Sequence, residues 1–318
     1  MKSILIIFTI SVLFSSVGAQ TIPMEQMLYD RFIETAISKS IEHDYAAAES
    51  AAVELIQMFP DSAAGWFFRA GVINSMMIDY EEPFREADFY AYVDSAIALA
   101  EAGIEREPDN PWHYFFRGGA LSYVAHHNIR SGRYFPALSS GLKAVGALKD
   151  AVRIDSSLYD AYLGLGNYYY WISRRTEFIR WMPFIPNRQE EGIEMIYKAM
   201  NRGKYSYESA ASALGWVFID AGRYEDALEV TADPLEKYPE SRFFMFSRAR
   251  SLFELGRYNE AAEEYLKLLK SVRSASRNNH FNEIGILAKI SESLVKIGDY
   301  DTARSEEHTS ELQSLLII

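Results

Sequence analysis

Two copies of one short motif stand 34 residues apart in the sequence, since 256 − 222 = 34. They are Gly-Arg-Tyr-Glu-Asp-Ala at 222–227 and Gly-Arg-Tyr-Asn-Glu-Ala at 256–261. A period of about 34 residues is typical of a repeat that consists of two antiparallel helices. Such a pair cannot bury its apolar face alone, so successive pairs stack on one another. The spacing therefore predicts an all-α solenoid.

The unit at 208–241 has small or turn-forming residues where a helix pair needs them. Gly215 and Ala227 are small at the points where we expect the two helices to cross closely. Gly222 can adopt the positive φ that ends a first helix. Pro239 lacks the N–H group that would continue the second helix. The unit thus predicts a helix, a tight elbow and a second helix that ends before Pro239.

This unit resembles the tetratricopeptide repeat family, whose pattern it matches at Leu214, Gly215, Phe218, Gly222, Tyr224, Ala227 and Pro239. Further elbows of the same kind stand at 43–45, 132–134 and 298–300. The resemblance covers 24–303 and is strongest over 208–270. It implies a right-handed superhelical solenoid of about six and a half helix pairs.

Two of the repeats are longer than the others. Pro60 and Pro108 precede similar aromatic stretches and lie 108 − 60 = 48 residues apart. Asp109 and Asp155 mark the next pair of equivalent positions, 155 − 109 = 46 residues apart. We interpret the excess as helices lengthened by up to about two turns each, which roughly preserves the face that points inward.

The resemblance also implies where a partner would bind. In this family the first helix of each repeat lines a concave groove that holds an extended peptide or a partner helix. Carried over to this sequence, the groove-facing positions are Trp112, Phe115, Tyr123, Asn167, Tyr170, Trp171, Ser212, Trp216, Asp220, Phe243, Phe246, Arg250, Phe253 and Glu254. Aromatic residues with a few charges are common at interfaces, but they also pack between repeats. The asparagine–lysine clamp with which the family holds a free C-terminus is not evident.

The regular pattern is interrupted at 173–189, where the chain is basic and aromatic. Insertions in repeat proteins often lie on the binding face. One interpretation is a ligand-binding loop that uses Arg174, Arg175, Arg180, Trp181 and Arg188. The other is a plug, with the arginines paired to glutamates and the groove filled by Phe178, Trp181, Met182 and Phe184. The two are not exclusive. A shorter basic stretch at 271–277 predicts a flexible connector.

The two ends differ in character from the repeats. Residues 1–19 predict a secretory signal peptide, because Lys2 precedes an apolar core at 4–14 and small residues at 17–19. The core is shorter than the roughly 20 residues that span a bilayer. We therefore expect cleavage after Ala19, a periplasmic or secreted protein, and no integral membrane span after cleavage. Residues 304–314 look like a translated sequencing adapter, so we treat 304–318 as an artefactual tail and 20–303 as the repeat domain.

Charge and composition argue against several functions. The formal net charge of −12 disfavours nucleic acid and anionic membranes as partners, although peripheral association with an outer membrane stays open. The chain has no cysteine for disulfides, thiol chemistry or lipid attachment. His126 and His127 are adjacent, so on a helix they point about 100° apart and cannot chelate one metal. No phosphate-binding loop or nucleophile elbow occurs, so we predict no catalytic residue, no cofactor and no metal site.

We therefore expect a non-enzymatic protein–protein interaction scaffold or adaptor of a bacterial cell envelope, with a partner polypeptide in its concave groove. Two alternatives stay open. A glycan-binding or small-ligand-binding module would need exposed, coplanar rings with polar neighbours. A helical-toroid hydrolase would need two or three carboxylates that converge in a deep pocket.

Overall fold

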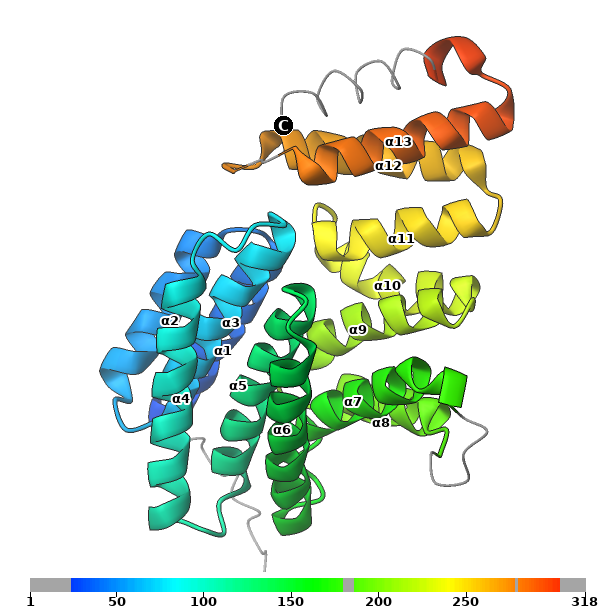
Figure 1. The fold of residues 1–318 in the computed structure, drawn as a ribbon. Coiled ribbons are helices and arrows are strands. Elements are labelled where there is room, and N and C mark those ends of the chain that lie inside the picture. Colours follow the sequence, from blue (N-terminus) through cyan, green and yellow to red (C-terminus); the bar gives the residue numbers. More distant parts are fainter. Residues whose placement is uncertain (1–23, 180–185, 278–279, 304–318) are drawn as a thin grey trace, which may run out of the picture.

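The computed structural model describes residues 24–179, 186–277 and 280–303, and in this part of the chain it is all-α (Figure 1). The helices are α1 (Met24–Ile41), α2 (Tyr45–Met58), α3 (Ala63–Asp79), α4 (Glu86–Arg106), α5 (Pro111–Arg130), α6 (Tyr134–Ile154), α7 (Ala161–Arg175), α8 (Gln189–Arg202), α9 (Tyr207–Asp220), α10 (Tyr224–Lys237), α11 (Arg242–Glu254), α12 (Tyr258–Ser274) and α13 (Phe281–Ile297). A short 3-10 helix, η1 (Glu177–Ile179), follows α7. The predicted signal peptide and tail lie outside the described residues.

The helices form consecutive antiparallel pairs, and this confirms the predicted helical-repeat solenoid. Each helix packs on the next, and the first helix of a pair also contacts the first helix of the following pair in most repeats. Pairs α1/α2 to α11/α12 give six repeats, and α13 begins a seventh. The predicted lengthening is also confirmed: α3 to α6 have 17, 21, 20 and 21 residues, whereas α9 and α10 have 14 each.

The elbows between paired helices require a left-handed backbone residue. Gly132, Gly222, Gly256 and Gly298 supply it, with φ between 70° and 85°. A residue without a Cβ adopts this conformation at no steric cost. The first two elbows depart from this rule, because His43 and Glu81 adopt φ of 63° and 50° there. A side chain there costs about 1–2 kcal/mol of strain, so something must hold it in place.

Close helix crossings depend on small residues. α7 and α8 cross at Gly166 and Gly192, where a Cβ on Gly166 would lie 2.5 Å from the carbonyl oxygen of Gly192. Gly215 is predicted to mark a crossing of α9 with its partner α10. A Cβ there would lie 3.1 Å from Thr231 of α10, and closer still, 2.7 Å, to Ser247 Oγ of α11. Backbone cannot move aside as a flexible side chain can, so the α7–α8 crossing admits no side chain at either glycine.

The solenoid turns sharply and closes on itself, which the sequence did not predict. In Figure 1, α1–α6 run up and down the page and α7–α13 cross it, with the upper ends of α1–α3 next to the left ends of α9–α12. Apolar contacts join the two stacks, where Ile41 of α1 packs with Ala211, Tyr238 and Phe244. Polar contacts join them as well: Asp30 accepts a hydrogen bond from Lys204 Nζ at 2.7 Å, and Arg277 Nη2 lies 2.6 Å from Glu82.

Two predicted irregular segments are more ordered than expected. The interruption at 173–189 is shorter, because α7 continues to Arg175 and η1 follows it. The stretch at 271–277 is not a flexible connector: 271–274 complete α12, and Ser276 and Arg277 contact Tyr80 and Glu82 of the first stack. The sequence interpretation of both segments rests on their basic composition. Composition does not show which distant residues a segment contacts.

The glycine crossing gives a direct test of the packing. We expect Gly166→Ala to destabilise the protein by about 1–3 kcal/mol or more, because its methyl group would overlap backbone of α8. Gly146 on α6 is the matched control, since a Cβ there meets nothing within 4 Å. Gly146→Ala should stabilise by about 0.5–1 kcal/mol through helix propensity. Urea unfolding of both variants checks this, and equal effects would contradict the described crossing.

Candidate functional site

Most of the predicted groove positions lie on three successive first helices. Together with Arg174, which was predicted as part of the insertion loop, they form one stripe on each helix: Asn167, Trp171 and Arg174 on α7; Ser212, Trp216 and Asp220 on α9; Phe246, Arg250 and Glu254 on α11. Residues three or four apart share one side of a helix. The three helices contact one another in order. We call these nine residues the first-helix face.

Hydrogen bonds tie the α7 and α9 stripes together. Asp220 Oδ2 accepts from Tyr170 Oη at 2.7 Å and from Arg174 Nε at 2.8 Å. Burial and the neighbouring Asp220 carboxylate both raise the pKa of Tyr170, so its hydroxyl stays a donor. On α11, Arg250 pairs with Glu254 at 2.6 Å. The face therefore has fixed, paired charges around its aromatic residues.

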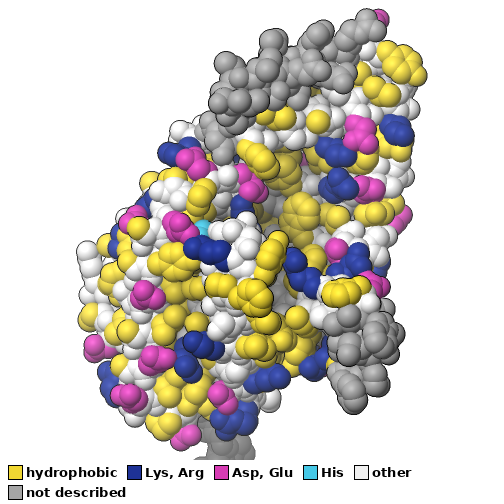
Figure 2. Space-filling model, in the orientation of Figure 1, with side chains coloured by type: hydrophobic (Ala, Val, Ile, Leu, Met, Phe, Trp, Pro, Cys, Tyr) yellow, Lys and Arg dark blue, Asp and Glu magenta, His cyan; other side chains and the backbone are white. Residues whose placement is uncertain are grey.

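Trp216 is the most open aromatic residue of this face. Its exposed fraction is 43%, whereas Trp171 packs partly against the α7–α9 core and Phe246 against the α11–α13 core. Figure 2 shows hydrophobic side chains in a hollow between the two stacks, with charged side chains of both signs beside it. An exposed indole between charged pairs resembles the centre of many interfaces, in which a large ring is surrounded by polar groups.

The remaining predicted positions contribute to packing within the chain. Tyr170 is only 2% exposed and lies in the core formed by α7 to α10. Tyr123 stacks on Phe67 with ring centroids 5.1 Å apart, and Phe115 lies against the same ring at 5.8 Å. Trp112 contacts Tyr205 between the stacks, and Phe243 lies 5.1 Å from the His43 ring. Phe253 is buried in the C-terminal core. In this closed arrangement these six rings contact the chain itself.

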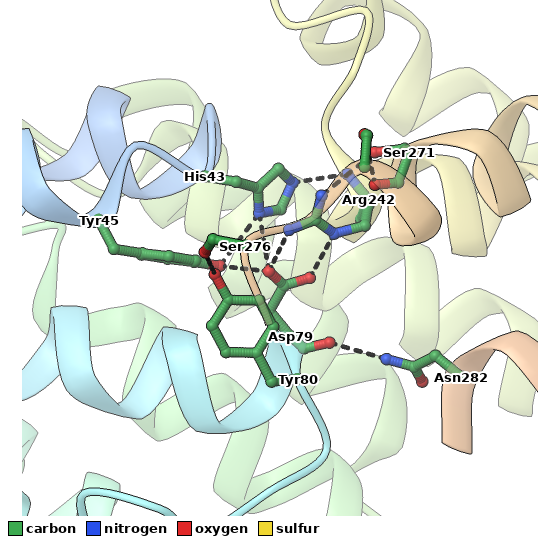
Figure 3. Close-up of polar contacts among 9 residues, drawn as sticks. His43, Tyr45, Asp79, Tyr80, Arg242, Ser271, Ser276 and Asn282 are labelled. Carbon is green, nitrogen blue, oxygen red and sulfur yellow. Dashed lines mark hydrogen bonds and ion pairs between the residues drawn. The ribbon is translucent and has the colours of Figure 1, made fainter. Parts of the chain in front are cut away.

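A buried polar cluster, which we call the clasp, joins the first two repeats to the sixth. It consists of His43, Tyr45, Asp79 and Arg242 (Figure 3). Arg242 Nε donates to Asp79 Oδ1 at 2.6 Å, and Arg242 Nη2 donates to Oδ2. Tyr45 Oη also donates to Asp79 Oδ2, at 2.8 Å. The side chains of Asp79 and Arg242 are only 2% and 7% exposed, so the pair is almost fully removed from water.

His43 completes the clasp with both ring nitrogens. Its Nε2 accepts from the backbone N–H of Arg242 at 2.8 Å, which places the ring proton on Nδ1. Nδ1 lies 3.2 Å from Asp79 Oδ2 and donates to it. Both ring nitrogens of His43 therefore make contacts within the clasp. The clasp therefore joins the two stacks through buried polar contacts.

The charge of Asp79 depends on its partners. Burial by itself raises the pKa of this carboxyl, but the hydrogen bonds from Arg242 and His43 outweigh it and lower the pKa to about 2. Asn282 at the start of α13 donates to the backbone oxygen of Asp79 at 2.7 Å. An adjoining cavity of about 10 Å³ has room for about one water molecule, far less than a sugar ring needs.

The insertion arginines have different surroundings. Arg174 pairs with Glu177 and Asp220, and Arg188 pairs with Glu191. Arg175 is exposed, while Arg180, Trp181, Met182 and Phe184 lie outside the described residues. Phe178 is 78% exposed, so the prediction that it packs into the groove is wrong. The arginine–glutamate pairing of the plug interpretation is confirmed at Arg174 and Arg188.

Sequence reasoning missed the clasp and could have found only part of it. The one signal is His43, which stands where the elbows at 132, 222, 256 and 298 have glycine. Asp79 and Arg242 are 163 residues apart, and their contact depends on the closure of the solenoid. In the described ranges no group of three or more His, Cys, Asp or Glu side chains is placed to hold a metal. No helix in those ranges is both long and apolar enough to cross a bilayer.

Comparison with protein families agrees with this geometry. Residues 212–277 match the family described as "Tetratricopeptide repeat", over α9 to α12. Over these residues the chain is therefore similar to the tetratricopeptide repeat family. A comparison with curated protein sequences gives no match.

Several solved structures are similar to the chain at low identity. A thermophilic tetratricopeptide repeat protein of Thermus thermophilus has a TM-score of 0.45 and 16% identity, covering 71% of this chain and 99% of that one. The human IFIT1 dimer with m7Gppp-AAAA has a TM-score of 0.46 and 12% identity, covering 94% of this chain and 74% of that one. The P58(IPK) repeat domain has a TM-score of 0.29 and 12% identity, covering 85% and 98%. At these scores nothing about ligands carries over to the present chain.

The clasp predicts a specific acid sensitivity. The pKa of Asp79 is about 2 in the folded chain against an ordinary value of 3.8, so its stabilisation is present above about pH 4 and is lost as pH falls toward 2. A shift of this size corresponds to about 2 kcal/mol. Between about pH 4 and pH 2 the free energy of unfolding should fall for both proteins. We expect the fall to be about 2 kcal/mol larger for the unmodified protein than for Asp79→Asn. Parallel pH profiles for the two proteins would contradict the described ion pair.

Proposed function

We propose that the protein is an interaction scaffold whose first-helix face binds a partner polypeptide. Tetratricopeptide repeats bind protein partners, and the observation that supports this particular face is the 43% exposure of Trp216 among paired charges. The closed solenoid favours it further. Rings on α5 and at the start of α11 are occupied by packing, so the α7–α11 stripes are the predicted groove positions that stay accessible.

The chemistry of the face suits a segment with one apolar side chain and flanking polar groups. Trp216 offers a flat apolar surface, and its indole N–H can donate to a backbone carbonyl of the partner. Arg174 and Asp220 on one side, and Arg250 and Glu254 on the other, are already paired. They can donate hydrogen bonds to a peptide, or accept them from it, without leaving an unpaired charge on binding.

We further propose that the scaffold acts in a cell envelope or outside the cell. The support is the sequence at 1–19, with its charged start, apolar core and small residues before Gln20. Association with a membrane surface would then depend on the bound partner. Mass spectrometry of the protein purified from an extracellular or envelope fraction tests this, since intact residues 1–19 would contradict it.

Replacing the exposed indole tests the binding face. We expect Trp216→Ala to weaken partner capture by about 2 kcal/mol, or roughly 30-fold, as for a central aromatic residue of an interface. Its partial exposure means that the melting temperature should change little. Quantitative mass spectrometry of proteins captured by immobilised variants provides the measurement.

Tyr300→Ala is the matched control, because Tyr300 is 64% exposed at the last elbow, away from the face. It should retain every captured polypeptide. If Trp216→Ala retains the same polypeptides in the same amounts as Tyr300→Ala, the first-helix face is not the binding surface.

A further inference from the structure

Three tyrosine rings on the α7–α8 part of the molecule each contact a cationic side chain. Arg188 lies 3.5 Å from the Tyr169 ring centroid, and Lys149 of α6 lies 5.7 Å from the same centroid. Lys198 lies 5.8 Å from the ring of Tyr162, and Arg202 lies 5.4 Å from that of Tyr159. We call these three tyrosines and four cations the tyrosine–cation row.

The row is continuous along the helix pair. Tyr159 and Tyr162 have ring centroids 6.1 Å apart, and Tyr162 and Tyr169 are seven residues apart on the same side of α7. Arg188, Lys198 and Arg202 follow α8 in the opposite direction. Fourteen residues separate Arg188 from Arg202, which corresponds to about 21 Å of helix. The row is thus an elongated surface.

Most of the positive charge of the row is not neutralised by carboxylates. Arg188 pairs with Glu191, but Lys149, Lys198 and Arg202 make no ion pair within the described residues. Most other lysines and arginines of this acidic chain do have a carboxylate partner there. A tyrosine ring has no net charge, so cation–π contact positions a cationic head group without cancelling its charge. The row is therefore a locally positive strip on a protein of net charge −12.

The acids near the row do not cancel this strip. Glu191 is committed to Arg188, and that hydrogen bond, together with nearby Lys149 and Lys198, lowers its pKa. Asp150 pairs with Arg153, and the exposed Glu194 lies one turn before Lys198 on the same side of α8. The four cations outnumber Glu191 and Glu194, so the strip keeps an excess of positive charge.

The row lies on the other side of α7 from the first-helix face. Tyr169 and Arg174 are five residues apart, which places them about 140° apart around the helix. Arg174 faces Asp220 of α9, whereas Tyr169 faces Arg188 and Lys149. A ligand on the row would therefore not compete directly with one at Trp216.

We propose that the tyrosine–cation row is a second binding surface, which takes an acidic peptide segment. Its length matches about six or seven extended residues, so carboxylates spaced along a peptide can meet Lys149, Lys198 and Arg202 in turn. A single phosphate group would need cations that converge, and these are spread along the helix. A long nucleic acid or an anionic membrane would extend onto the acidic surroundings and be repelled. A short peptide is attracted over roughly the 8 Å Debye length at physiological salt.

A labelled oligoglutamate of about ten residues tests the proposal by fluorescence anisotropy at low and physiological salt. We expect the unmodified protein to bind it in a salt-dependent manner. The triple variant K149Q/K198Q/R202Q should bind about tenfold more weakly, since each exposed pair contributes a modest amount.

The control is R106Q/K270Q/K296Q, which likewise removes two lysines and one arginine, all of which make no ion pair among the described residues. It should bind like the unmodified protein, and so should Trp216→Ala, which separates this surface from the first-helix face. Absent binding, an equal loss in both triple variants, or tighter binding of a single-stranded oligonucleotide of equal charge would each overturn the proposal.

Discussion

The ion pair between Asp79 and Arg242 holds the solenoid closed, and the arrangement of the other surfaces depends on that closure. A solenoid built from neighbour contacts alone would stay open, because each repeat touches only the next. Here a carboxylate at the end of α3 binds a guanidinium at the start of α11, and both are removed from water. Removing charges from water is costly unless they are paired and fully hydrogen-bonded, so the clasp holds only when all of its partners are in place.

His43 shows how local strain and long-range contact depend on each other. A glycine at the first elbow would relieve the positive φ, but it would remove the group that bonds both Asp79 and the backbone of Arg242. The strain is tolerated because the imidazole satisfies a buried carboxylate and a buried N–H at once. The weaker Glu82–Arg277 and Asp30–Lys204 pairs lie at more exposed places of the same junction and help to fix its register.

Much of the fold follows from residues that act locally. The 34-residue spacing, the elbow glycines and the small residues at helix crossings predicted the helix pairs and the lengthened α3–α6, since each depends on a few neighbouring positions. The closure could not be predicted in this way, because Asp79 and Arg242 are ordinary charges until the superhelix brings them together. For the same reason the groove residues could be predicted only in part. The family pattern identified the side of each helix, but whether Trp112 packs on Tyr205 or Trp216 remains exposed depends on how the two stacks meet.

The account depends on direct coupling across the junction, and a double-mutant cycle measures it. Asp79→Ala, Arg242→Ala and the double variant are unfolded with denaturant at neutral pH, and the interaction energy is the departure from additivity. A direct buried pair predicts a coupling of at least about 1.5 kcal/mol, with the double variant less destabilised than the sum of the single ones. Additivity within about 0.5 kcal/mol would mean that the second and sixth repeats do not meet through this pair, and the closed solenoid would be contradicted.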